Sequence, residues 1–377
     1  MPIINKENNI LFVAYYDLMV NSNRNVAVSA ANKIDYIISL LNRNGYIVNI
    51  LSPAESKYKG FQSRQIRRFE NNTLFLFPSY HSELRIINYF SRIFTRIFFM
   101  IELIRSCVKF RTVIIYHSMS LRWVIFFLKL LKCDVILELE ELYSDLVESE
   151  RKMKKIEIKY INKYEKFILS NVSLSKYIEN KSNLVVINGN YFNNNFNEKK
   201  KQSSTINLVY SGTFEKSKGV IEAIHLAEKL PSEYCLHILG YGNNQEVTEV
   251  KSLINKINEY SLCEVKYLGL LKGEEFDVYL SENCDIGLIC QDIHASYSST
   301  SFPSKILSYL RNGLAVLSVD EESIRNSEVS PLIHFYQDNN FYDVLRSISV
   351  VEQKKKNSSF LKKLDEKKLQ QINELVK

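Results

Sequence analysis

Four short segments in the second half of the chain contain residue types that bind phosphate. They are Ser211-Gly-Thr213, Lys218-Gly219, Gly240-Tyr-Gly242 and Leu268-Gly-Leu270, and each borders an apolar run. Glycine lets a ligand approach the backbone closely, and a lysine ammonium attracts phosphate oxygens. The third segment alone is weak evidence, because it lacks the third glycine of a dinucleotide-binding fingerprint. Together the four segments indicate an anion-binding site.

A serine-rich segment at positions 298–305 is the most informative of the candidate anion-binding segments. It reads Ser-Ser-Thr-Ser-Phe-Pro-Ser-Lys and leads directly into an apolar helical pattern. Pro303 suits the first position of a helix, where its missing N–H costs nothing. The next three N–H groups, through Ile306, would then be free to bind a diphosphate beside Lys305. A loop that only caps a helix is the alternative.

The hydrophobic pattern of the first half predicts a parallel sheet. A buried-strand pattern at 10–14 is followed by a helical pattern at 26–42, which Gly45 closes, and by a second strand at 46–51. A strand, a helix and a strand within about forty residues form a βαβ unit. Further strands are expected at 112–116, 135–139, 172–175 and 184–187, with an apolar helix at 121–131.

The alternation of strands and helices restarts after a polar, Asn-rich segment at 188–204, which indicates a domain boundary. The pattern predicts two doubly wound α/β domains that face a central cleft, with ligands bound beyond the carboxyl ends of the strands. The strands of this half are expected at 206–210, 235–239, 265–268, 286–290 and 314–319, and the helices at 220–229, 247–260, 274–282 and 305–311.

The predicted domain boundaries follow from these patterns. The N-terminal domain covers 1–190, the linker 191–204 and the C-terminal domain 205–350. The tail at 351–377 has apolar residues at helical spacing and many lysines, so we expect an amphipathic helix that packs back on the N-terminal domain.

Composition limits the classes of protein that remain. The 377 residues are about twice the usual length of one domain. There are 49 basic and 42 acidic residues, a net charge of +7 that suits phosphates or acidic lipids, and no nucleic-acid recognition motif. The six cysteines form no C-x-x-C pair and mostly lie in apolar runs, which predicts buried thiols. Because no spanning or signal segment is evident, we expect a cytoplasmic protein, either free or at the inner face of the cell membrane.

One helical segment, at 84–111, combines apolar residues with cations. Its apolar residues recur every three or four positions, and arginines and lysines occupy the polar side. An aromatic-rich, basic amphipathic helix is typical of proteins that bind a membrane surface. An ordinary helix packed on the first sheet, with its arginines exposed, is the alternative.

Five segments between positions 209 and 316 resemble, in order, the nucleotide-sugar domain of GT-B glycosyltransferases, most closely glycosyltransferase family 4. The first half agrees in its strand–helix rhythm and in the segment 185–189 before the hinge. The resembling segments are Val209-Tyr-Ser-Gly-Thr-Phe-Glu-Lys-Ser-Lys-Gly-Val220, Leu236-His-Ile-Leu-Gly-Tyr-Gly242, Val265-Lys-Tyr-Leu-Gly-Leu-Leu271, Cys284-Asp-Ile-Gly-Leu288 and the segment from Ser301 to Val316.

The resemblance implies a GT-B fold and a retaining, metal-independent transfer of a sugar from a nucleotide-sugar, UDP-linked by family frequency. The acceptor would be a glycan or a lipid-linked sugar in surface polysaccharide synthesis. No metal or other cofactor is expected, so lysines and backbone amides would stabilise the leaving diphosphate. The residues implied as catalytic are His117, Lys218 and Lys305, and those implied in donor binding are Gly212, Thr213, Gly240, Tyr241, Leu270, Leu271, Phe302, Pro303, Ser304 and Ser308 with both lysines.

The chain also departs from the family pattern. Thr213 stands where family members carry an arginine, and Thr300 and Ser308 stand where they carry two glutamates. A serine at 308 would hold the ribose hydroxyls more weakly than a carboxylate. These departures favour an alternative function, a non-catalytic GT-B subunit that binds a partner transferase or a glycan.

Residues of the first half would bind the acceptor. Glu138 and Glu140 alternate at the end of a predicted strand and would share one side of it, where a carboxylate could orient an acceptor hydroxyl or act as a general base. A solvent-exposed acidic turn is the alternative there, as a hydrogen-bonded structural histidine is for His117. Tyr15 and Tyr16, at the end of the first strand, could hydrogen-bond a sugar.

Overall fold

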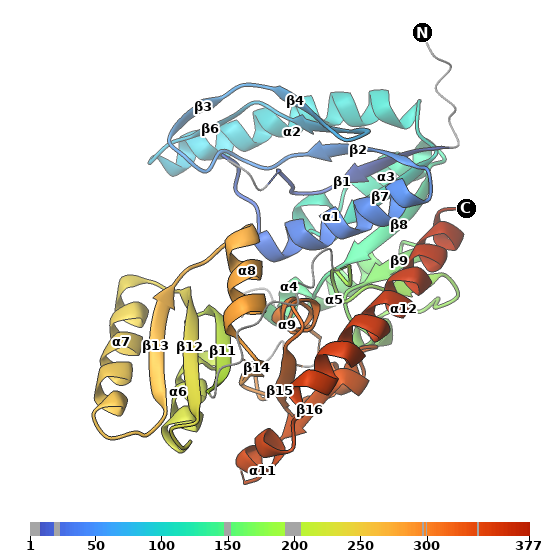
Figure 1. The fold of residues 1–377 in the computed structure, drawn as a ribbon. Helices are drawn as coiled ribbons and strands as arrows, with labels where there is room; N and C mark the ends of the chain where they lie inside the picture. The colour runs from blue at the N-terminus through green and yellow to red at the C-terminus, as the bar shows by residue number, and fades with distance from the viewer. Residues whose placement is uncertain are drawn as a thin grey trace. The chain divides into compact units, whose positions relative to one another are not determined.

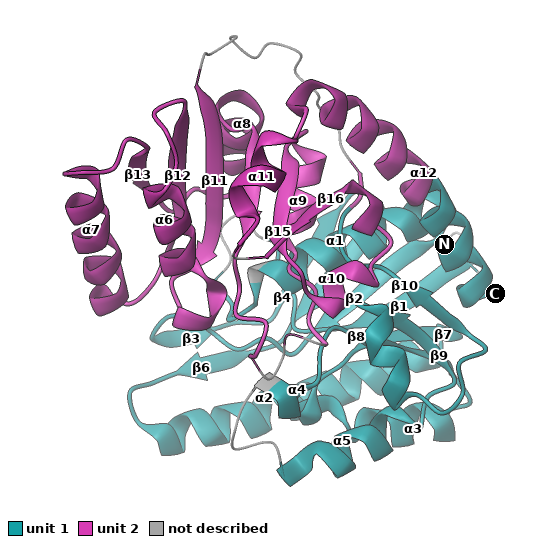
Figure 2. Ribbon diagram, turned by 90° about the horizontal axis from the view of Figure 1, so that it is seen from below, with its two compact units in different colours: residues 1–190, 366–377 teal, residues 191–365 magenta. Residues whose placement is uncertain are grey.

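The computed structural model describes residues 8–18, 23–146, 152–192, 205–295, 298, 300–337 and 339–377. The chain forms two compact units, Met1–Asn190 with Glu366–Lys377, and Tyr191–Asp365 (Figure 2). Residues 193–204 of the expected linker and 19–22 of the loop after the first strand lie outside the described residues. Both units contain a largely parallel sheet with helices, as the sequence predicted (Figure 1).

The sheet of unit 1 has eight strands in the order β10-β9-β8-β7-β1-β2-β5-β4, and β4 alone runs antiparallel to its neighbour. A separate antiparallel pair is formed by β3 (Gly60–Gln62) and β6 (Ser79–His81). The strands of the large sheet are β1 (Asn9–Val13), β2 (Ile47–Ser52), β4 (Gln65–Phe69), β5 (Asn72–Leu76), β7 (Thr112–Tyr116), β8 (Asp134–Leu139), β9 (Lys166–Leu169) and β10 (Leu184–Val186).

Helices cover both faces of this sheet. Between β1 and β2 lies α1 (Val28–Arg43), which ends before Gly45; that glycine has φ 84°, the left-handed conformation that terminates helices. The connections through α2 (Arg85–Cys107) and α3 (Val124–Leu130) run toward the opposite sheet edge, so right-handed crossovers place these helices on the other face. One hydrophobic cluster joins side chains of α2, α3 and α5 (Lys154–Ile161) to those of β1, β7, β8 and β9.

The expected strand at 172–175 is wrong. These residues belong to a 3₁₀ helix, Val172–Tyr177, and the strand β9 precedes it. The side chain of Asn171 accepts a hydrogen bond from the N–H of Ser173 at 2.9 Å. Such a local side-chain contact begins a helical turn in spite of the β-branched residue that follows.

The sheet of unit 2 has six parallel strands in the order β13-β12-β11-β14-β15-β16. The expected helix at 305–311 is present with those bounds as α9, whereas β16 and α11 were not expected. The strands are β11 (Ile206–Thr213), β12 (Tyr234–Tyr241), β13 (Glu264–Gly269), β14 (Ile286–Ile289), β15 (Ala315–Val319) and β16 (Ile333–Tyr336); the helices are α6 (Val220–Glu228), α7 (Asn244–Asn258), α8 (Gly273–Asn283), α9 (Lys305–Arg311), α10 (Glu322–Arg325) and α11 (Phe341–Arg346).

The C-terminal tail is one helix, α12 (Val350–Val376). Its last residues belong to unit 1, where Asn44 donates to the carbonyl of Leu369 at 2.8 Å and Tyr46 donates to Asn373 at 3.1 Å. Among the described residues, none of the helices is both long and apolar enough to cross a bilayer.

Candidate functional site

The candidate donor site lies at the carboxyl edge of the unit 2 sheet, where β11 and β12 end side by side. Gly212 pairs with Gly240 in the parallel register. Gly240 has φ 153°, and a Cβ there would lie 1.9 Å from the carbonyl oxygen of Gly212. Only glycine fits this close approach at position 240, where the backbones of the two strand ends are in direct contact.

The side chain of Lys305 fills the space beside this backbone. Its Nζ would lie 2.8 Å from a Cβ at Gly212, and it sits over the ring of Tyr210, 4.3 Å from the ring centroid. Burial and the nearby positive charge of Lys218 lower the pKa of Lys305 to about 8, although Cys290 opposes this. Among the described residues no carboxylate pairs with the Lys305 ammonium. Lys305 therefore carries a partly buried positive charge that no carboxylate among the described residues pairs with.

The loop that carries Lys218 is held against the end of β14. The hydroxyl of Tyr210 lies 3.0 Å from the carbonyl oxygens of both Thr213 and Lys218 and donates to them. Gly219 follows with φ 85°, and a Cβ there would lie 1.9 Å from the carbonyl oxygen of Cys290. Lys218 lies near enough to Lys305 for their charges to interact.

Tyr309 anchors the helix that supplies Lys305. Its hydroxyl accepts a hydrogen bond from the N–H of Ser211 at 2.8 Å, and its ring lies where a side chain at Gly287 would be, 2.1 Å from the Cβ position. Because Lys305 and Tyr309 are four residues apart in α9, they share one face of the helix. Tyr210 and Tyr309 were not predicted as site residues. The four-residue spacing from Lys305 was the signal in the sequence that could have identified Tyr309.

The prediction of three unpaired amides before α9 is wrong in part. The helix begins at Lys305 with Ser304 as its N-cap, so Pro303 precedes the cap. The N–H of Ile306 donates to the carbonyl of Pro303 at 3.0 Å, because the chain makes a 3₁₀-type turn at this point. Phe302 and Pro303 are buried, and Ser304 is exposed without a side-chain cap.

The remaining expected donor-site residues lie on or near the same edge. Tyr241, at the end of β12, is 53% exposed, and Leu270, after β13, is 44% exposed. Leu271 is half-buried. Ser308 is half-buried in α9, and its carbonyl accepts the side-chain amide of Asn312 at 2.9 Å. Thr300 is 1% exposed.

In unit 1, His117 follows β7 at the carboxyl edge of that sheet. Its Nε2 lies 2.7 Å from a carboxylate oxygen of Glu157, and its ring stacks on Tyr160 with centroids 5.7 Å apart. Burial raises the pKa of Glu157, but hydrogen bonds from His117 and Ser144 outweigh it and hold that pKa below its usual range. The Nδ1 atom of His117 is buried without a hydrogen-bond partner among the described residues. The ring is thus fixed on one side and unsatisfied on the other.

Glu138 and Glu140 share one lysine. The Nζ of Lys33, from α1, lies 2.6 Å from Glu138 and 2.9 Å from Glu140. The side chain of Glu138 is fully buried, and burial raises its pKa to about 7, whereas that of Glu140 is 22% exposed. The expected acceptor contact of Glu138, and its exposed-turn alternative, are therefore wrong. Nothing in the sequence connects Lys33 with a strand a hundred residues away.

The two tyrosines after β1, Tyr15 and Tyr16, also differ in how far their side chains are buried. Tyr16 is 1% exposed and its hydroxyl donates to Asp35, so the expected acceptor contact of Tyr16 is wrong. Tyr15 is half-buried, and its hydroxyl lies 2.7 Å from that of Ser120. Burial raises the pKa of Tyr15.

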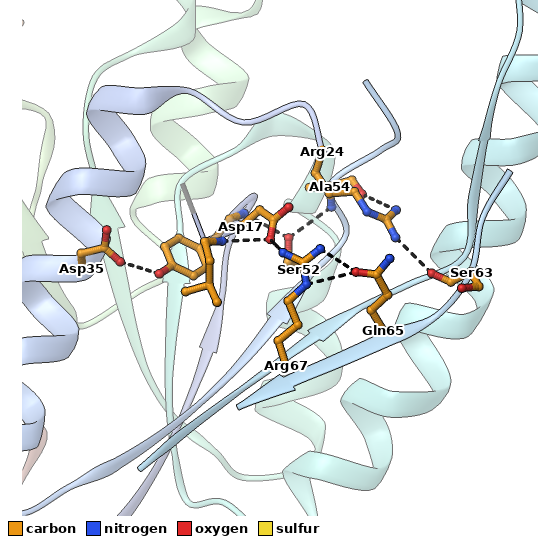
Figure 3. A network of polar contacts seen from close by, with 10 residues as sticks. Asp17, Arg24, Asp35, Ser52, Ala54, Ser63, Gln65 and Arg67 are labelled. Carbon is orange, nitrogen blue, oxygen red and sulfur yellow. Dashed lines mark hydrogen bonds and ion pairs between the residues drawn. The ribbon is translucent and has the colours of Figure 1, made fainter. Parts of the chain in front are cut away.

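A network of polar side chains fixes the end of β1 (Figure 3). Asp17, fully buried, accepts a hydrogen bond from Arg67 of β4 at 2.8 Å, and Arg67 also donates to Gln65. Arg24 donates to the carbonyls of Ala54 and Ser63. The charged groups at this edge are therefore paired with other protein groups.

Comparison with known proteins identifies the fold. No family model matches the chain, and no curated protein matches its sequence. A structure described as "Trehalose-6-phosphate from E. coli bound with UDP-2-fluoro glucose" is similar with a TM-score of 0.66 and 11% identity, covering 98% of this chain and 97% of that one. Sucrose-phosphate synthase from Thermosynechococcus elongatus is similar with a TM-score of 0.63 and 12% identity, covering 98% and 94%. Anabaena Alr3699/HepE in complex with UDP and glucose is similar with a TM-score of 0.59 and 11% identity, covering 97% of each chain.

These similarities extend over nearly the whole chain and show that the fold is GT-B, the class that the sequence analysis predicted.

Proposed function

We propose that the chain is a glycosyltransferase that transfers a sugar from a UDP-linked donor to a glycan or lipid-linked acceptor. The observation that carries this proposal is the partly buried ammonium of Lys305 beside the backbone of Gly212, without a carboxylate partner among the described residues. An unpaired buried cation is costly, and a donor diphosphate would supply the missing negative charge. Two of the similar structures are complexes with UDP or a UDP-sugar, which supports UDP as the nucleotide.

In this proposal the chemistry is electrostatic. Lys305 and Lys218 neutralise the charge that grows on the diphosphate as the bond to the sugar breaks. The reaction is metal-independent and retains the configuration of the sugar, as in glycosyltransferase family 4, to which we assign the chain on its motifs. His117 is the proposed contact to the donor sugar through its unsatisfied Nδ1, and Glu140 and Tyr15 are the proposed contacts to the acceptor.

The proposed setting is surface polysaccharide synthesis at the inner face of the cell membrane. The segment 84–111, which includes α2, is the proposed contact with the membrane. Its exposed side chains include apolar residues as well as arginines, for example Ile86, Phe90 and Arg96. This combination supports the membrane interpretation over an ordinary helix with a polar outer face.

A specific observation favours a second candidate, the non-catalytic GT-B subunit. Thr300 and Ser308 provide hydroxyls where carboxylates are expected, and the Thr300 side chain is enclosed. A subunit of this kind would bind a glycan or a partner transferase without turning over a nucleotide-sugar.

Thermal unfolding with UDP and UDP-sugars, followed by an assay for UDP release, tests the proposal. UDP at a hundred times its Kd should stabilise the wild type by about 2.7 kcal/mol. Lys305→Ala and Lys218→Ala should remove most of this stabilisation, and Lys256→Ala, an exposed lysine of α7, should not. Stabilisation without UDP release from any UDP-sugar would favour the non-catalytic subunit. Equal stabilisation of wild type and Lys305→Ala would reject the site.

A further inference from the structure

The outer surfaces of α2 and α3 expose large apolar side chains of unit 1. In α2, Ile86 is 66% exposed, Phe90 63% and Ile97 53%. In α3, Phe126 is 61% exposed and Leu130 79%. We refer to the exposed side chains of these two helices as the α2–α3 face.

Packing on the sheet does not account for the composition of α2. The buried residues of this helix form a narrow stripe that includes Thr95, Phe99 and Leu103. Apolar residues continue around the exposed part of the helix, where an ordinary surface helix is polar. In unit 2, by contrast, the exposed Leu262 lies in the loop after α7 and the exposed Val278 lies in α8. The α2–α3 face therefore has the composition of an interaction surface.

A tryptophan joins the two helices into one surface. The ring of Trp123, immediately before α3, meets Phe99 of α2 at 6.1 Å between centroids and Phe127 of α3 at 5.9 Å. Both contacts are edge-on. The same hydrophobic cluster holds the inner sides of both helices against the sheet. Their exposed sides thus belong to one layer of unit 1.

The charge on this layer is positive. Arg85 and Arg96 of α2 and Arg122 and Lys129 of the α3 region are exposed, and among the described residues none of the four has an ion-pair partner. The sequence of α3 contains no acidic residue, and α2 contains only Glu102. Lys163 lies 4.0 Å over the ring of Phe126, which adds a further cation beside α3.

We propose that the α2–α3 face docks on an anionic lipid bilayer, with α3 as a second contact beside α2. The aromatic and aliphatic side chains would enter the boundary between headgroups and acyl chains, and the cations would bind the headgroup phosphates. Charge complementarity selects this occupant, because a protein partner would need to supply an apolar surface with an acidic rim. The inference deepens the membrane contact of the proposed function and rests on it for its setting.

Trp123 provides a natural probe, because it is the only tryptophan of the chain. The full-length protein is mixed with vesicles of phosphatidylcholine alone or of phosphatidylcholine with phosphatidylglycerol, and binding is measured by co-sedimentation. Binding should require phosphatidylglycerol and weaken with salt. Brominated acyl chains should quench Trp123 in the bound protein. Binding without quenching would place the contact elsewhere and overturn the proposal.

Matched variants assign the contact to α3. Phe126→Glu with Leu130→Glu should weaken binding to phosphatidylglycerol vesicles by about a hundredfold or more, because two large apolar side chains no longer insert. Arg122→Gln with Lys129→Gln should weaken it by about thirtyfold. Leu262→Glu, an equally exposed change in unit 2, should have no effect. Equal binding by the first double variant and the wild type would overturn the role of α3.

Two further measurements separate this inference from the proposed function. Phe126→Glu with Leu130→Glu should keep its stabilisation by UDP, since the donor site lies in unit 2. Vesicle binding by a wild type that UDP does not stabilise would reject the proposed transferase and leave the docking face standing. A concentration-dependent dimer that the double variant abolishes, without vesicle binding by the wild type, would show a second copy as the occupant and overturn the inference.

Discussion

The carboxyl edges of the two sheets differ in whether their charged side chains have oppositely charged protein partners. In unit 1, Lys33 is held by Glu138 and Glu140, and Asp17 is held by Arg67. In unit 2, Lys305 is half-buried against glycine backbone, and no carboxylate among the described residues pairs with it. A buried charge that the protein itself neutralises contributes to structure, whereas one left without a counter-charge indicates an anionic ligand. The difference supports the unit 2 edge as the proposed donor site.

Removing each buried lysine should give the largest effects, with opposite signs. Lys33→Met leaves two carboxylates without their cation and should destabilise the protein by about 3–5 kcal/mol. Lys305→Met removes a partly buried charge that no carboxylate among the described residues pairs with, and it should stabilise the ligand-free protein by about 1 kcal/mol, after allowance for the partial exposure. Urea unfolding without ligand measures both changes. If both variants changed the free energy of unfolding in the same direction, the proposed difference between the two edges would be wrong.

A pair of glycine substitutions tests the close backbone approach at the donor edge. Gly219→Ala places a Cβ 1.9 Å from the carbonyl oxygen of Cys290 and should cost about 3 kcal/mol of unfolding free energy. Gly269→Ala also has a positive φ, 76°, but meets no atom within 4 Å, so it should cost about 1 kcal/mol of strain. Equal losses would show that backbone strain, rather than contact with β14, requires glycine at 219.

The titration of Lys305 should appear in the pH dependence of UDP binding. Its pKa in the ligand-free protein is lowered to about 8, so the ammonium is present below that pH and is lost above it. UDP affinity should therefore be constant up to about pH 8 and then fall by about tenfold per pH unit. Bound UDP should raise this pKa, so binding near pH 8 should take up protons, which calorimetry in two buffers can measure.

The ligand-free protein should show the opposite trend with pH. Between about pH 8 and the unfolded value near 10.5 the unfolded state binds more protons at Lys305, so stability should rise with pH in that window. Lys305→Met provides the control, because it should remove both trends. A pH-independent UDP affinity up to pH 10 would contradict the role of this ammonium.

The smallest expected effect concerns helix capping. Asn243 forms a complete capping box with Glu246 at the start of α7, so Asn243→Ala should cost about 1 kcal/mol. Ser304 makes no side-chain cap at the start of α9, so Ser304→Ala should change unfolding free energy by less than about 0.5 kcal/mol. If both variants lost a similar amount of unfolding free energy in thermal unfolding, the serine-rich segment would be a helix cap.

Much of the fold and the donor edge could be predicted from the sequence, because the signals are local. Apolar runs of four to eight residues and helical periodicity predicted the positions of most strands and helices. Gly212 and Lys218 lie at or just after the end of a predicted strand, and Lys305 lies at the start of a predicted helix. The errors are also local in origin: Asn171 starts a 3₁₀ turn where a strand was expected, and the amide of Ile306 is used within its own turn.

The roles of other residues depend on contacts between distant segments. The positions of Tyr16 and Glu138 at strand ends predicted contacts with an acceptor. In the structure both side chains are buried, and Asp35 and Lys33 of α1 bind them. Their surroundings come from a helix packed over the sheet, and no spacing in the sequence encodes that partner.

The sequence by itself determined the alternation of elements, and therefore which loops meet at the carboxyl edge of each sheet. The tertiary structure alone decided which charges at those edges are neutralised, because pairing depends on distances of a few ångströms between side chains of different elements. That is the physical reason why Lys33 and Lys305, both lysines in or at the start of a helix, have different surroundings: α1 lies against the acidic end of β8, and α9 lies against the glycine end of β11.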